Sequence, residues 1–180
     1  MRRSLGLASL SPNLEAFARR IGALRGARRI GLALLLGIAL AATMPPVHAL
    51  PLFPIALTGV VWLIAGSRSG ASAFATGFWF GLGFFLAGLY WIGFALMTDP
   101  ERYGWLVAPA VIGIAGGLAL FIAVAALMLH LLRLDGLWRV LAFALIWSGL
   151  EWLRGHILSG FPWNLASFLD LRRKYRIVPL

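Results

Sequence analysis

Residues 105–132 read WLVAPAVIGIAGGLALFIAVAALMLHLL, a run of 28 residues without Asp, Glu, Lys or Arg. About 20 apolar residues in a helix are enough to cross the hydrocarbon core of a bilayer, so this run predicts a transmembrane helix. The composition of the whole chain agrees, since 61% of its 180 residues are hydrophobic and 12% are charged. A soluble domain typically has about 45–50% apolar and about 25% charged residues. The sequence is therefore that of a membrane protein.

Working outward from this run, we predict an all-α fold, a polytopic membrane helix bundle with about five transmembrane helices. The predicted spans are residues 30–44, 49–65, 71–97, 105–132 and 137–153. The first two are short for a bilayer and are separated by Pro45-Pro46, so they could be two tilted spans or a short hairpin that dips into the membrane. A signal peptide cleaved after Ala49 is another interpretation, but the chain stays apolar beyond that residue. The predicted domains are a basic lead-in (1–29), a transmembrane domain (30–164) and a basic, divergent tail (165–180).

The basic residues predict how the chain is oriented. The formal net charge is +10, and seven arginines fall within residues 1–29. Because basic residues flanking membrane spans favour the cytoplasmic side, we predict a multi-pass protein of the bacterial inner (plasma) membrane with a cytoplasmic N-terminus. From Ser11 the lead-in has the pattern of an interfacial helix on anionic headgroups, although a disordered basic tail also fits. Nucleic acid is not an expected partner, because no basic patch is interleaved with stacking aromatic side chains.

Two pairs of glycines within the predicted spans are four residues apart. They are Gly77 with Gly81, and Gly113 with Gly117. Small residues at this spacing let a neighbouring helix approach closely. We therefore predict that both pairs serve helix packing.

Polar and turn-forming residues concentrate in residues 147–164, WSGLEWLRGHILSGFPWN. Glu151 and Arg154 are three residues apart, so on a helix they share a face and can neutralise each other. That is one interpretation of the pair; the other is that it positions a phospholipid headgroup at the outer side of the membrane. The turn that follows has the pattern of an interfacial anchor. Its residues are Gly160, Phe161, Pro162 and Trp163.

Several of these segments resemble the membrane part of apolipoprotein N-acyltransferase. The most specific are Glu151-Trp-Leu-Arg154-Gly155 and Gly160-Phe-Pro-Trp163-Asn164, supported by GFWFGLGFF at residues 77–85 and the hairpin broken by Pro45-Pro46. The resemblance covers about residues 28–164. It implies transfer of an acyl chain from membrane phospholipid to the N-terminus of a diacylglyceryl-cysteine apolipoprotein, during lipoprotein maturation. In this family a nitrilase-like domain with a Glu-Lys-Cys triad carries the chemistry. The resemblance implies a further interpretation of each feature: Glu151 and Arg154 position that catalytic domain at the membrane surface, and Phe161 and Trp163 line the entrance through which acyl chains reach its active site.

No catalytic residue of that triad can be assigned in these residues. The sequence has no cysteine, and Lys174 is its only lysine. We therefore expect the chain to be inactive by itself, as a truncated or frame-shifted product or a fragment, with a separately encoded catalytic half as a conceivable partner. No metal or cofactor is expected, since the three histidines lie in separate segments without ligand spacing.

A non-enzymatic polytopic membrane protein, such as a transporter or an assembly subunit, is the alternative function. Transporter sites usually have broken helices or ionisable groups near the middle of the membrane. The centres of the five predicted spans are uncharged, which favours the acyltransferase interpretation.

Overall fold

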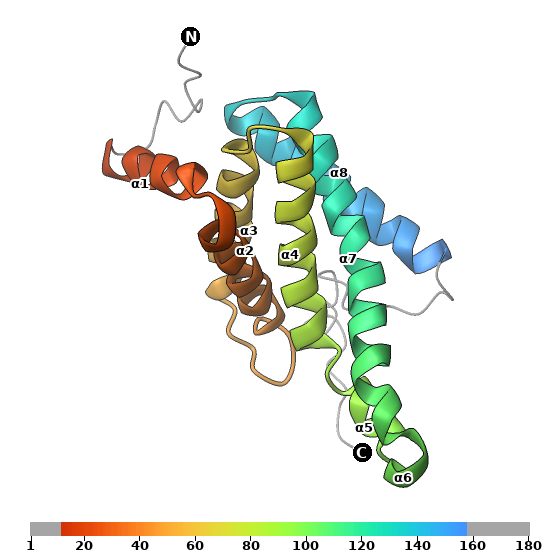
Figure 1. Cartoon of the computed structure of the whole chain (residues 1–180). Coiled ribbons are helices and arrows are strands. Elements are labelled where there is room, and N and C mark those ends of the chain that lie inside the picture. Colours follow the sequence, from red (N-terminus) through yellow and green to blue (C-terminus); the bar gives the residue numbers. More distant parts are fainter. Residues whose placement is uncertain (1–11, 158–180) are drawn as a thin grey trace, which may run out of the picture.

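The computed structural model describes residues 12–157, which form a bundle of helices (Figure 1). No β-strand occurs among these residues. The helices are α1 (Pro12–Ala23), α2 (Gly26–Ala41), α3 (Leu52–Ala65), α4 (Gly70–Gly88), α5 (Ile92–Leu96), α6 (Pro100–Tyr103), the 3-10 turn η1 (Gly104–Leu106), α7 (Val107–Leu132) and α8 (Gly136–Ile157). The predicted all-α class is confirmed.

Helix α4 is the centre of the bundle. It packs against α2 on one side and α7 on the other, and α8 packs against α7. Three phenylalanines of α4, Phe80, Phe84 and Phe85, are fully buried in the shared core. In Figure 1, α1 and the α3–α4 and α7–α8 connections lie at one end of the bundle, whereas α5 and α6 lie at the other.

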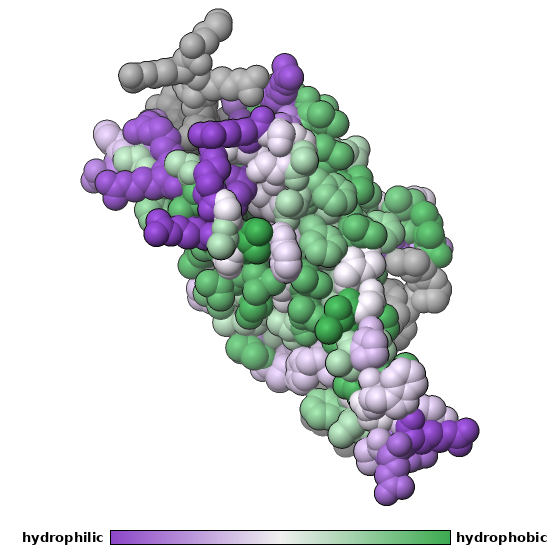
Figure 2. All heavy atoms as spheres, viewed as in Figure 1, coloured by the Kyte–Doolittle hydropathy of each residue, from purple (hydrophilic) through white to green (hydrophobic). Residues whose placement is uncertain are grey.

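The surface has the distribution of a membrane protein. Figure 2 shows hydrophilic residues gathered at the two ends of the molecule, with a broad hydrophobic region between them. Three helical segments are long and apolar enough to cross a bilayer, namely α4, the segment from Pro100 to Leu132, and α8. Helix α3 is apolar but shorter, and α2 has 16 residues, so helix length does not establish the predicted number of about five spans.

Two helix boundaries differ from the predicted spans. The helix expected over residues 71–97 ends at Gly88, and the separate α5 begins at Ile92. Apolar composition persists through this break, so hydropathy alone could not locate it. Helix α2 begins at Gly26, ahead of the apolar run, and so includes Arg28 and Arg29 in its first turn.

Glycines set the separation between α4 and its neighbours. An added Cβ at Gly77 would lie 2.6 Å from Ala126 Cβ, and one at Gly81 would lie 3.0 Å from Ala119 Cα, so both glycines face α7. Gly113 and Gly117 differ from that prediction, since a Cβ on either would meet no described atom within 4 Å. Spacing identifies small residues but not the side from which a neighbouring helix comes.

Candidate functional site

The Glu151–Arg154 pair predicted from sequence forms on the last turns of α8. Arg154 Nη2 lies 3.8 Å from Glu151 Oε1. The side chain of Arg154 is only 2% exposed and that of Glu151 is 13% exposed. The pair therefore lies within the packed bundle and is not a solvated surface ion pair.

An aromatic ring of α4 completes the surroundings of Arg154. The guanidinium carbon lies 5.0 Å from the centroid of the Phe85 ring. A guanidinium over an aromatic face is attracted by the ring quadrupole, and the attraction strengthens when water is excluded. Phe85 thus joins the end of α8 to the last turns of α4. Spacing along one helix cannot predict this contact, because the two residues are far apart in the sequence.

A second aromatic contact between these helices lies one to two turns earlier along α8. Trp147 packs edge-on against Phe80 of α4, with ring centroids 6.4 Å apart, and against Phe143 of its own helix at 5.6 Å. Trp147, Glu151 and Arg154 are spaced four and three residues apart, so they share one face of α8. That face is fixed to α4, whereas Leu145 and Trp152 are exposed on α8.

His156 lies at the exposed end of the same helix. Its ring stacks near that of Trp152, with centroids 4.2 Å apart, and its Nδ1 lies 2.7 Å from the Trp152 carbonyl oxygen. The turn predicted to follow, Gly160, Phe161, Pro162 and Trp163, lies outside the described residues.

The matched sequence profile decides which family these helices belong to. Residues 36–172, more than half of the chain, match the profile of the apolipoprotein N-acyltransferase N-terminal domain. The chain belongs to this family. The resemblance predicted from the Glu151–Asn164 stretch is thereby confirmed.

Full-length relatives give the same result. Apolipoprotein N-acyltransferase of Brucella melitensis is 42% identical over 164 residues, covering 86% of this chain and 31% of that protein. The enzyme of Rhodopseudomonas palustris is 42% identical over 149 residues, covering 79% and 28%. That of Caulobacter vibrioides is 43% identical over 139 residues, covering 76% and 26%. The chain spans less than a third of the length of these relatives.

The match to the N-acyltransferase N-terminal domain includes every residue of the candidate site. Glu151, Arg154 and the 160–163 turn all fall inside residues 36–172. The match also continues past Asn164, where the tail was predicted to diverge. The domain boundaries given above stay predictions.

Sequence patterns do not identify one buried cation of the chain, Arg29. The pattern of basic residues assigns Arg29 only to orienting the chain, yet its side chain is 5% exposed. Its Nε donates to Thr76 Oγ1 of α4 at 2.8 Å, and its Nη2 donates to the Leu63 carbonyl of α3 and to Ser67 Oγ. The residue therefore fastens α2 to both neighbouring helices at the end where α1 lies. Its position directly before the apolar run was the one available signal.

Proposed function

We propose that this chain is the membrane part of an apolipoprotein N-acyltransferase, which transfers an acyl chain from phospholipid to the N-terminus of a diacylglyceryl-cysteine lipoprotein. The observation that carries the proposal is the ion pair of Glu151 and Arg154, buried against Phe85 inside the matched domain. Burying two charges costs several kcal/mol per ion unless each is well compensated. A pair retained at that cost at the end of a membrane helix is suited to fixing that end in one position.

The burial of Arg154 favours one of the two roles considered for the pair. A headgroup phosphate has little access to a guanidinium whose side chain is 2% exposed. We therefore assign the pair to positioning. It fixes the end of α8, the helix that precedes the predicted Gly160–Trp163 turn in the sequence, relative to α4. Phe161 and Trp163 are then the residues proposed to meet acyl chains.

The proposed orientation places this end of α8 on the outer side of the inner membrane. The basic residues outside the spans support it, since Arg68 and Arg133 lie on the connections at the same end of the bundle as α1 (Figure 1). Clustering of arginine at one end favours a cytoplasmic location for that end. The opposite location follows for the ends of α4 and α8.

Acyl transfer itself is proposed to need a catalytic domain that these residues do not supply. A thioester intermediate requires a thiolate, and the 180 residues contain no cysteine. By this proposal the bundle supplies access to membrane phospholipid and a fixed platform, and the apolipoprotein meets the platform at the outer surface.

A chimera tests the proposal. Residues 12–157 replace the matching segment of the full-length Brucella melitensis enzyme, and acyl transfer to a lipopeptide is measured in membranes. We expect the chimera to be active and Glu151→Gln to lower its rate about tenfold or more, because small displacements of a catalytic assembly cost up to about 100-fold.

The matched control is Asp135→Asn, which breaks the Asp135–Arg139 ion pair at the other end of α8. This control is expected to keep the rate of the unmodified chimera. An inactive chimera that folds and inserts normally would overturn the proposed function. Equal rates for the two variants would overturn the positioning role.

A further inference from the structure

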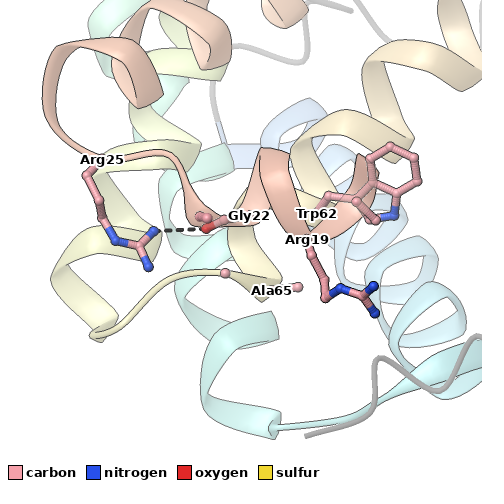
Figure 3. A pocket seen from close by; sticks show the side chains of 8 residues that line it. Arg19, Gly22, Arg25, Trp62 and Ala65 are labelled. Carbon is pink, nitrogen blue, oxygen red and sulfur yellow. Dashed lines mark hydrogen bonds between the residues drawn. The ribbon is translucent and has the colours of Figure 1, made fainter. Parts of the chain in front are cut away.

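A hollow of about 240 Å³ opens between α1 and the end of α3 (Figure 3). Its lining includes the small residues Gly22, Ala65 and Gly66, the ring of Trp62, and two arginines, Arg19 and Arg25. It lies at the end of the bundle away from the Glu151–Arg154 pair. It has no part in the function proposed above.

Close backbone packing fixes the walls of this hollow. Gly22 of α1 crosses Gly66 so closely that a Cβ on Gly66 would lie 2.0 Å from the Gly22 carbonyl oxygen. The Phe17 ring packs edge-on against Trp62 with centroids 5.9 Å apart. Because both crossings join α1 to α3, the hollow is a fixed feature of the fold.

The guanidinium of Arg25 is held in place by backbone carbonyls. Its Nη1 donates to the carbonyl oxygens of Gly22 at 2.8 Å and Leu24 at 2.7 Å. Within residues 12–157, its Nε and Nη2 donate to no other group, although a guanidinium has five N–H donors. One edge of the fork is therefore anchored, and the other is available to a ligand.

Arg19 supplies a second positive charge across the hollow. Figure 3 shows Arg19 and Arg25 on either side of Gly22 and Ala65. The Nη1 of Arg19 lies 3.2 Å from Glu15 Oε2, an exposed pair within one helix. Such exposed pairs contribute little and are readily exchanged for a stronger acceptor.

We propose that this hollow binds the phosphate of an anionic phospholipid in the leaflet on which α1 lies. Arginine matches phosphate oxygens with paired hydrogen bonds. Within residues 12–157, Glu15 pairs with Arg19, whereas no carboxylate pairs with Arg25. A lipid is favoured over a soluble phosphate ester because Trp62 lines the hollow and Phe17, 54% exposed, lies beside it. Aromatic rings of this kind sit at the level of lipid headgroups.

The test is native mass spectrometry of the purified full chain titrated with phosphatidylglycerol or phosphatidylcholine. We expect one phosphatidylglycerol to be retained in preference to phosphatidylcholine. Arg25→Gln should weaken the binding of this phosphatidylglycerol about fivefold. That change corresponds to about 1 kcal/mol, the contribution of one arginine near an anionic surface. Ala65→Leu keeps every charge and fills the hollow, so it should also weaken the binding of this phosphatidylglycerol.

Arg68→Gln is the matched control, because it removes one exposed positive charge from the same end of the bundle, outside the hollow. Arg68→Gln should leave the binding of this phosphatidylglycerol unchanged. The proposal would be overturned if Arg25→Gln and Arg68→Gln weakened the binding of this lipid equally, or if Ala65→Leu bound it as tightly as the unmodified chain. Displacement of the lipid by equimolar glycerol 3-phosphate would also overturn it, because a soluble ester would then be the better ligand.

Discussion

Replacing Gly37 by alanine tests whether α2 and α4 are in direct backbone contact. A Cβ at Gly37 would lie 2.0 Å from the Phe80 carbonyl oxygen and 2.8 Å from the Phe84 nitrogen. Ordinary contact begins at 3.4 Å, so the first distance is too short by 1.4 Å, the difference of the two values. Both atoms belong to helix backbone, which cannot rotate out of the way as a side chain can. The two helices must therefore separate.

The expected cost follows from two opposing terms. Alanine favours a helix over glycine by about 1 kcal/mol, whereas overpacking a core costs about 1–3 kcal/mol and occasionally more. A contact this short belongs at or above the upper end of that range. We expect Gly37→Ala to lower the free energy of unfolding by about 2 kcal/mol. Gly117→Ala, which meets no described atom within 4 Å, should leave it unchanged or raise it by up to about 1 kcal/mol.

Both variants can be measured by unfolding the purified chain in mixed micelles with increasing SDS. Fluorescence of the eight tryptophans reports the transition. Gly117→Ala is the control for the substitution itself. If Gly37→Ala were as stable as Gly117→Ala, the close packing of α2 on α4 would be refuted.

The same SDS titration tests two further contacts. Thr76→Val removes the acceptor of the Arg29 Nε hydrogen bond. We expect it to lower the free energy of unfolding by about 1.5–3 kcal/mol. The control is Thr43→Val, which removes a hydrogen bond between two neutral groups, the buried Thr43 hydroxyl and the Leu40 carbonyl. It should lower the free energy of unfolding by about 1 kcal/mol. Equal decreases for the two variants would contradict the role given to Arg29. Phe84 and Phe85 are both fully buried and pack on each other, but of the two only Phe85 lies under the Arg154 guanidinium. We therefore expect Phe85→Leu to lower the free energy of unfolding by about 1–2 kcal/mol more than Phe84→Leu does. No difference between the two would show that the contact with Arg154 adds no stability.

The sequence predicted the helical class well because hydropathy is a local property. Helices α7 and α8 lie over the apolar runs of residues 105–132 and 137–153, and Glu151 and Arg154 share one face of α8. The Gly160–Trp163 turn lies outside the described residues, so its prediction is not tested.

What the sequence could not predict depends on contacts between distant segments. Hydropathy did not separate α4 from α5, because the residues between them are also apolar. The glycine spacing occurs in both α4 and α7, yet only the pair on α4 faces a neighbour within the described chain. Arg29 looked like one more orienting charge, because its partners Leu63 and Thr76 lie 34 and 47 residues away in the chain.

The central claim is that the bundle holds the Glu151–Arg154 end of α8 at the outer surface of the inner membrane. Because the chain has no cysteine, one introduced cysteine reports its own location. His156→Cys and Arg68→Cys place single thiols at exposed positions, at the far end of α8 and on the α3–α4 connection. In intact spheroplasts a membrane-impermeant maleimide should label His156→Cys, and should label Arg68→Cys only after the membrane is permeabilised. Labelling of Arg68→Cys but not of His156→Cys in intact spheroplasts would contradict the account.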